Sequence, residues 1–269
     1  MPLFSIITPV YNPPRDAFES CVDSVRAQSA GDWEWCLCDD SSTQPWVAQR
    51  LAELQIEDVR IKVTHRTTNG GIVAASNDAI SIAAGEFLVL LDNDDMLHAE
   101  ALALVAAAIS SSPFTDYVYS DEDKITPEGT HFGEFRKPKW SPERLLAQNY
   151  TSHLSVLRRS VVNDVGRFRP GFDGSQDYDL VLRVIEQARH IVHVPHVLYH
   201  WRSLPTSTAS SASAKPYAFT AALQAVTGHL QRSDISGEVT EAGPSLARIR
   251  RHPTRHPHVS VIVPIDGST

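Results

Sequence analysis

The sequence of 269 residues is poor in cysteine, in long apolar runs and in basic charge, and each shortage excludes a class of protein. Its three cysteines, Cys21, Cys36 and Cys38, cannot form a disulfide framework, which favours a reducing compartment. No run approaches the roughly 20 apolar residues of a membrane-spanning helix, and the N-terminus lacks the basic start of a signal peptide. We therefore expect a cytoplasmic protein whose membrane contact, if it has one, is peripheral at the inner face.

The charge and the missing glycine motifs exclude further classes. A net charge of −8 argues against nucleic acid as the main partner. The sequence contains neither a G-x-G-x-x-G motif nor a P-loop, so neither a nicotinamide-dependent enzyme nor an ATPase is expected. Basic residues gather late, at Arg248, Arg250, Arg251 and Arg255, where we expect a solvated linker, with contact to anionic lipid as the alternative.

Apolar strands alternate with helical patterns through the first half of the chain. Continuous apolar runs are typical of strands buried on both faces, so the pattern predicts an α/β fold with a mostly parallel central sheet flanked by helices. Strands are predicted at 4–10, 33–40, 59–65, 86–92 and 116–123, and helices at 15–28, 42–55, 69–85 and 98–112. Gly85 is expected to close the third of these helices.

The second half is less regular, and it ends on a repeat. Helices are predicted at 141–149, 175–188 and 216–233, a strand at 190–202, and a Ser/Thr/Ala loop at 204–215. The stretch VSVIVPIDG (259–267) mirrors FSIITPVYN (4–12). We expect a domain over 1–245, a linker over 246–258, and at 259–269 the truncated start of a second, similar domain, with chance likeness of two strands as the alternative.

The stretch FLVLLDNDDML (87–97) ends a buried strand with three acids in four residues. Residues i and i+2 of an extended chain point the same way, so Asp92 and Asp94 can face one site. Paired carboxylates suit Mg²⁺ or Mn²⁺, which can hold a diphosphate. A calcium loop fails because Gly and Glu are missing at its sixth and twelfth positions. An aspartate-dependent phosphatase and simple helix capping remain as alternatives.

Other polar residues are expected at the same edge of the sheet, because ligands of such folds bind beyond the carboxyl ends of the strands. Asp39 and Asp40 end the second strand, where an acid accepts hydrogen bonds from a ribose or base edge or caps a helix. Asp177 and Asp179 begin a helix after a glycine-rich loop, which suits either a general base or the helix dipole. Of four histidines at 190–200, His200 is singled out as a metal or phosphate ligand.

Six motifs in order resemble family 2 glycosyltransferases with the GT-A fold. They are SIITPVYN, CDDSS, NGGIVAASNDAI, LLDNDD, GSQDYDL and YHWR, between Phe4 and Arg202. Further stretches, YSDEDK and KPKWSPERLLAQNY, resemble the bacterial cell-surface polysaccharide branch, including rhamnosyltransferase-like enzymes, which often carry tandem domains. One departure is Ser41, which stands where the family often has glycine.

The resemblance implies a role for each matching residue. It divides the domain into a nucleotide-sugar-binding half over 1–123 and an acceptor half over 124–245, with Asp177 as the catalytic base. The metal ligands implied for Mn²⁺ or Mg²⁺ are Asp94, Asp92 and His200, and the acceptor contacts are Glu122, Trp140 and Gln176. The residues implied for nucleotide binding are Thr8, Pro9, Tyr11, Asp39, Asp40, Gly71, Asn77, Asp92 and Asn93.

The implied reaction moves a sugar from a UDP- or dTDP-linked donor to a hydroxyl of a glycan or lipid-linked acceptor, with inversion. A non-catalytic nucleotide- or glycan-binding module of a tandem enzyme is the alternative from another class, and an aspartate-dependent phosphatase is a further one.

Overall fold

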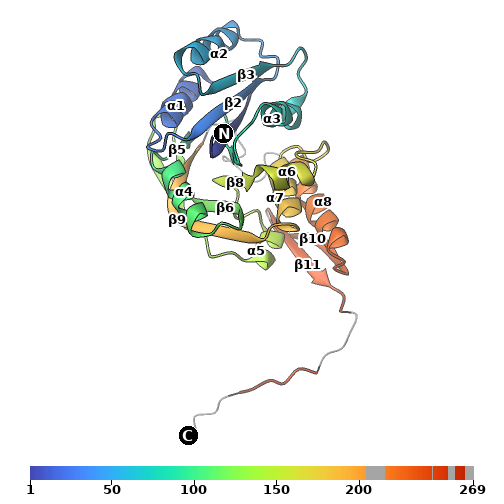
Figure 1. Ribbon diagram of the computed structural model, residues 1–269. Coiled ribbons are helices and arrows are strands. Elements are labelled where there is room, and N and C mark those ends of the chain that lie inside the picture. Colours follow the sequence, from blue (N-terminus) through green and yellow to red (C-terminus); the bar gives the residue numbers. More distant parts are fainter. Residues whose placement is uncertain (204–215, 244, 254–257, 264–269) are drawn as a thin grey trace.

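Four parallel strands form the first half of a nine-stranded sheet (Figure 1). In the computed structural model, which describes residues 1–203, 216–243, 245–253 and 258–263, they pair in the order β3-β2-β1-β4. The strands are β1 (Phe4–Val10), β2 (Trp33–Asp39), β3 (Ile61–His65) and β4 (Phe87–Leu90), joined by α1 (Arg15–Arg26), α2 (Pro45–Glu57) and α3 (Gly71–Ser81). The α/β class predicted from the alternating pattern is confirmed.

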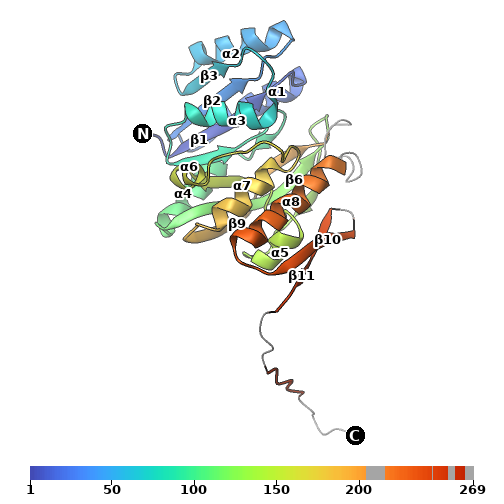
Figure 2. The same ribbon diagram turned by 90° about the vertical axis from the view of Figure 1, so that its right-hand side faces the viewer.

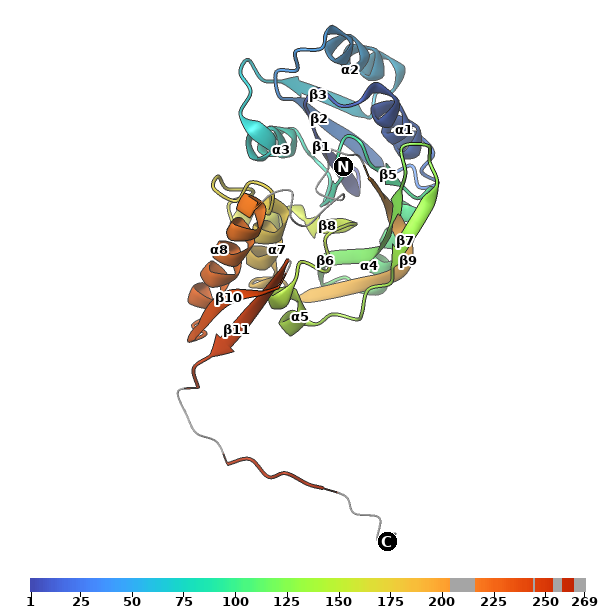
Figure 3. The same ribbon diagram turned by 180° about the vertical axis from the view of Figure 1, so that it is seen from behind.

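Antiparallel pairs extend the sheet into the second half of the chain. β8 pairs antiparallel with both β4 and β6, and β6 pairs in parallel with β9. The short strands β5 and β7, which the sequence did not predict, pair antiparallel with β9 and β6 (Figure 3). The bounds are β5 (Met96–Leu97), β6 (Thr115–Ile125), β7 (His131–Phe135), β8 (Ser155–Arg158) and β9 (His190–Arg202).

Helices cover both faces of the sheet, and each face has its own core (Figure 1). Successive residues of β1 alternate between the faces, so that Ile6 packs in the core beneath α1 and α2, and Ile7 in the core beneath α3. Cys36 and Cys38 are free cysteines that are buried in the same core as Ile7. The remaining helices are α4 (Ala101–Ser111), α5 (Pro142–Ala147), α6 (Arg159–Asp164), α7 (Gln176–Ile185) and α8 (Pro216–Arg232).

A hairpin replaces the first part of the predicted linker. Residues 246–251 form β11 (Leu246–Arg251), which pairs antiparallel with β10 (Gly237–Gly243) beside α5 and α8 (Figure 2). The described residues 258–263 are exposed and carry no strand assignment, so the predicted start of a second domain stays a prediction. The loop predicted at 204–215 lies outside the described residues. Among those described, no helix is both long and apolar enough to cross a membrane.

Gly85 differs from its predicted role. Helix α3 ends at Ser81 with Ile82 as its C-cap, so Gly85 does not close it. Gly85 instead packs against the start of β1, where a Cβ atom would lie 2.6 Å from the backbone nitrogen of Ser5. Its own amide donates to the Ser5 hydroxyl over 2.8 Å. The absence of a side chain permits this close approach.

We expect Gly85→Ala to destabilise the fold by about 1–3 kcal/mol, because the new methyl group would push backbone atoms apart in a packed core. Urea denaturation followed by circular dichroism measures the change. Gly31→Ala is the matched control, since a Cβ atom at Gly31 would meet no other atom within 4 Å. Equal stability of the two variants would contradict the close-approach role.

Candidate active site

A cleft of about 930 Å³ opens beyond the carboxyl ends of β1 and β4, between the two halves of the chain. Its wall combines strand ends of the first half with the loop and first turn of α7 in the second half. Five predicted site residues line it, namely Pro9, Asp92, Glu122, Gln176 and Asp177. The structure therefore brings the acidic turn and the predicted base to one cavity.

The three aspartates of the acidic turn, Asp92, Asp94 and Asp95, differ in their surroundings. Asp92 lines the cleft, and one ligand atom of each of Asp92, Asp95 and His153 lies within 4.8 Å of the others. Asp95 is buried, accepting from the Tyr199 hydroxyl over 2.5 Å and from the Arg202 amide over 2.7 Å. Both oxygens of Asp95 are thereby engaged with β9, which leaves Asp92 and Asp94 as the acids available to a ligand.

The electrostatics of the turn favour a bound cation. Burial raises the pKa of Asp92, and the charge of Asp177 raises it further, against the opposing effect of His153. Burial and then the charge of Asp92 raise the pKa of Asp94 to about 6. Buried carboxylates that repel one another are relieved by a divalent cation, and oxygen donors suit Mg²⁺ or Mn²⁺. The chemistry of this donor set therefore fits the metal that the sequence implied.

Asp177 enters the cleft from the first turn of α7. Its Oδ2 accepts from the Asn149 side chain over 3.0 Å, which fixes the carboxylate beside the cavity. The other amide atom of Asn149, its Oδ1, is buried and has no hydrogen-bond partner among the described residues. Asp179, from the same turn, is buried between Arg169 and Arg183 and is structural. The two acids that the sequence left open thus have different roles.

His153 is a site residue that the sequence interpretation missed. Its ring stacks on Tyr199 with centroids 4.5 Å apart, and its backbone amide donates to Glu122 over 3.1 Å. Glu122 also pairs with the buried Lys137 over 2.8 Å. His153 lies in an ordinary polar stretch, TSHLS, and only the antiparallel placement of β8 beside β4 brings it to Asp92.

The acid pair after β2 holds backbone loops in place through hydrogen bonds. Asp40 accepts from the amides of Gly70 and Gly71, each over 2.8 Å. Asp39 accepts from the amide of Ser42 over 2.9 Å. These contacts hold the two loops that border the end of β1, and they occupy the oxygens of both acids within the protein.

Several residues implied for the nucleotide are engaged within the protein. The Thr8 hydroxyl accepts from the Trp35 indole over 2.9 Å, and the Asn93 amide donates to the Pro9 carbonyl over 2.8 Å. Both polar atoms of Asn77 bond the backbone of Phe168, so Asn77 clamps a loop of the second half. Tyr11 alone in this group is exposed, at 47%.

The backbone at Ser41 has a conformation typical of glycine, the residue that the family often has at this position. Its φ of 62° lies in the left-handed region, which glycine adopts without steric cost and other residues rarely adopt. The backbone therefore keeps the conformation of a glycine position while the sequence carries serine.

His200 and Trp140, like Asp94 and most of the residues implied for the nucleotide, lie outside the cleft lining. His200 alternates with Tyr199 and Trp201 along β9, and only those two neighbours line the cleft. Its Nδ1 bonds to Asp123 over 2.6 Å, so the structure does not group it with Asp92 and Asp94. Trp140 packs beside Tyr119, with ring centroids 6.4 Å apart.

The sequence profile described as "Glycosyl transferase family 2" matches residues 5–166, more than half of the chain. The chain therefore belongs to glycosyltransferase family 2.

Curated relatives show what the chain resembles. It is 46% identical over 234 residues to protein y4gI of Sinorhizobium fredii, covering 86% of this chain and 26% of that protein. It is 37% identical over 263 residues to the O-antigen biosynthesis protein RfbC of Myxococcus xanthus, covering 98% of this chain and 21% of that protein. The chain thus spans about a quarter or less of the length of these relatives.

A solved structure shows the same fold. TarS residues 1–349 of S. aureus, in complex with UDP-GlcNAc, superposes with a TM-score of 0.70 at 20% identity. The match covers 87% of this chain and 68% of that one. At this identity the likeness establishes the fold.

We expect Mn²⁺ to stabilise the protein more at pH 7.5 than at pH 5. The folded pKa of Asp94, about 6, lies above its ordinary value of 3.8, so the metal-free fold loses stability from this group as the pH rises through 6. A cation binds the ionised form and offsets that loss. Thermal denaturation with and without Mn²⁺ at both pH values measures the effect. Asp94→Asn should reduce the pH dependence, which Asp92 also contributes to, and an equal shift of the unmodified chain at both pH values would contradict the ligand assignment.

Proposed function

We propose that the chain is a metal-dependent inverting glycosyltransferase that moves a sugar from a nucleoside diphosphate sugar to a hydroxyl of a glycan or lipid-linked acceptor. The observation that carries the proposal is the pairing of Asp92 and Asp177 across one cleft. They come from opposite halves of the chain, and the charge of Asp177 acts on the pKa of Asp92. In this cleft Asp92 would lie beside the donor and Asp177 beside the acceptor. That arrangement suits a direct displacement of the leaving diphosphate by the acceptor oxygen.

The donor end is supported by the loops around Asp40. Gly70 and Gly71 are held close to the end of β1, where backbone can approach a nucleotide. Asp92 and Asp94 would hold the cation beside the diphosphate, and the imidazole of His153 lies at ligand spacing from Asp92 and Asp95. A bound divalent cation would neutralise charge that develops on the leaving diphosphate. The TarS complexes with UDP and with UDP-GlcNAc support a nucleotide sugar as donor.

The acceptor end is supported by Asp177 and Asn149. The Asp177 carboxylate is held by the amide of Asn149 and takes the proton of the acceptor hydroxyl. The unpartnered Oδ1 of Asn149 offers a second acceptor atom to a sugar hydroxyl beside it. The oxygen that loses its proton attacks the anomeric carbon from the face opposite the leaving group, so configuration inverts through an oxocarbenium-like transition state.

Two further observations favour polysaccharide synthesis as the setting. RfbC is named for O-antigen biosynthesis, and a chondroitin synthase of Pasteurella multocida is 28% identical over 201 residues. Both are far longer than this chain, which covers 20–21% of each. A second glycosyltransferase domain following residue 258 fits the repeat of the first strand in the sequence.

We expect Asp177→Asn to lower kcat by about 10²–10⁴-fold, because the amide cannot accept the proton. The affinity for nucleotide sugar should change little, since the carboxylate serves the acceptor. Donor turnover with Mn²⁺ and isothermal titration with the donor measure the two quantities.

Asp173→Asn is the matched control, because Asp173 lines the same cleft four residues earlier. It should keep most of the activity. Turnover of Asp177→Asn within about threefold of the unmodified chain would contradict the base assignment, and phosphate release from simple esters would favour the phosphatase alternative. Donor binding without transfer to any acceptor by the unmodified chain would favour a non-catalytic module.

A further inference from the structure

Strands β6 and β9 carry a second polar cluster on the face that turns away from the cleft. Glu122 and Lys124 of β6 line the cleft, and Asp123 stands between them. On β9, Tyr199 and Trp201 line it, with His200 between them. Because successive residues of a strand point to opposite faces, Asp123 and His200 lie together behind the active site.

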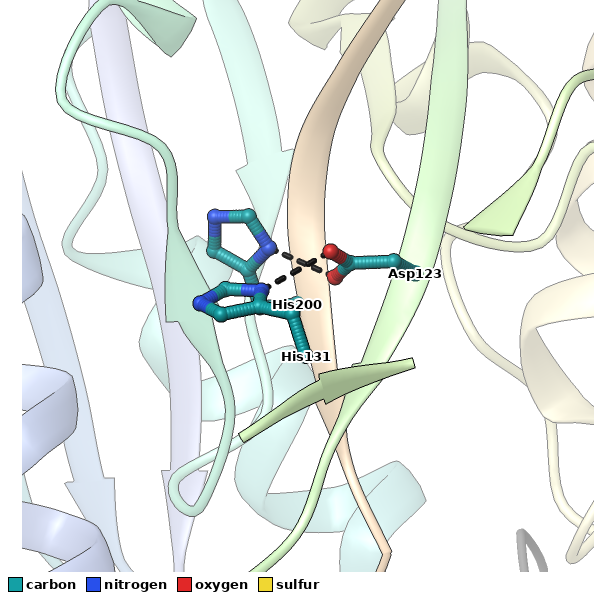
Figure 4. Close-up of side chains that lie close together, drawn as sticks. All are labelled: Asp123, His131 and His200. Atoms are coloured by element: carbon teal, nitrogen blue, oxygen red, sulfur yellow. Dashed lines mark hydrogen bonds and ion pairs between the residues drawn. The ribbon is translucent and has the colours of Figure 1, made fainter. Parts of the chain in front are cut away.

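The cluster joins three strands through one carboxylate (Figure 4). His200 Nδ1 lies 2.6 Å from Asp123 Oδ1, and His131 Nδ1, from β7, lies 2.8 Å from Asp123 Oδ2. The two imidazole rings meet edge to face with centroids 4.6 Å apart. One ligand atom from each residue lies within 4.8 Å of the other two, the spacing of a metal centre.

Burial and access are both suitable for a bound ion. Asp123 and His200 are each 8% exposed, whereas the side chain of His131 is 53% exposed. Two buried ligands in the sheet and one partly exposed ligand bring the donor atoms together and leave an open path for entry.

We propose that Asp123, His131 and His200 form a Zn²⁺ site, distinct from the cation site of the active-site cleft. Two imidazole nitrogens and one carboxylate oxygen make a donor set that suits zinc, whereas Mg²⁺ and Mn²⁺ prefer oxygen. On coordination, each Nδ1 bonds the ion in place of its hydrogen bond to Asp123, and the proton of the neutral imidazole moves through solvent to Nε2.

We assign the fourth position of a tetrahedral ion to water and not to His98. The His98 ring lies edge-on to His200, with centroids 6.1 Å apart. Its Nδ1 accepts from the Glu100 amide over 3.2 Å, so the proton sits on Nε2. Because neither ring nitrogen of His98 is then free to bind the ion, His98→Ala should leave the zinc affinity unchanged.

The bound ion would fasten the β6–β7 hairpin to β9. The strands that it joins carry Glu122, Lys124, Tyr199 and Trp201 on their other face, so the ion would hold the acceptor side of the cleft from behind. This role does not depend on the proposed reaction, and zinc binding is measured without any sugar.

The test is a zinc titration of the chain after treatment with a chelator and gel filtration. Isothermal titration calorimetry with ZnCl₂ should show about one ion per chain. His131→Ala should weaken binding by more than the roughly 10–100-fold that loss of an outer-shell partner costs. At free Zn²⁺ about a hundred times Kd, the melting temperature should rise by roughly 5–10 °C in the unmodified chain and not in His131→Ala.

Matched variants separate this site from other sources of zinc affinity. His196→Ala removes an exposed histidine of the same strand and should leave binding unchanged. The double variant Asp92→Asn and Asp94→Asn should also keep the ion, because those residues lie on the other face. Asp123→Asn preserves the shape of the buried residue and should lose the ion while the far-ultraviolet circular dichroism stays unchanged.

Three results would overturn the site. One is the absence of stoichiometric binding at 100 µM Zn²⁺, on the order of the weakest specific sites. Another is an equal affinity of His131→Ala and the unmodified chain. The third is loss of the ion in the Asp92 and Asp94 double variant, which would place zinc in the cleft.

Discussion

The buried carboxylate of Asp95 fixes the geometry on which the site depends. It ties the acidic turn after β4 to β9 through the Tyr199 hydroxyl and the Arg202 amide, both in the second half of the chain. Burial raises the pKa of Asp95 well above its ordinary value, and the neighbouring charges of Asp94 and Asp92 add to this. The turn therefore holds three carboxyl groups where they cannot move apart, and their mutual repulsion is relieved by protonation or by a bound cation.

The two halves meet in one continuous sheet because β8 lies antiparallel between β4 and β6. That placement sets the residues before β8, including Asn149 and His153, beside the strand that ends in Asp92. The first half supplies an acidic edge at parallel strand ends, and the second half supplies a carboxylate at a helix start. A rigid sheet between them fixes their separation, which is the condition for positioning two reactants against each other.

The sequence predicted most of the regular structure, since apolar periodicity is a local signal. It also predicted the cleft residues that sit at strand and helix ends, such as Asp92 and Asp177. It did not predict the task of Asp95, because burial against β9 depends on a pairing 107 residues away. His200 was assigned to the active site because its motif points there, but strand alternation turns it to the other face. Hairpin β10–β11 was missed because its arginine-rich strand has the composition of a solvated linker.

The pairing of β6 with β9 shifts register at Ser120/Asp121 and again at Asp121/Glu122. Each bulge changes the face that the later residues of its strand occupy. The alternation of side chains at the ends of both strands is therefore out of step with the alternation at their beginnings. Beyond the bulges, alternate residues of β6 and β9 face either the cleft or the reverse side of the sheet. The register partners Lys124 and Trp201 line the cleft, whereas the preceding pair, Asp123 and His200, bond to each other on the reverse side. A substitution on the cleft side can therefore change the lining of the cavity without touching the contacts that join the strands behind it.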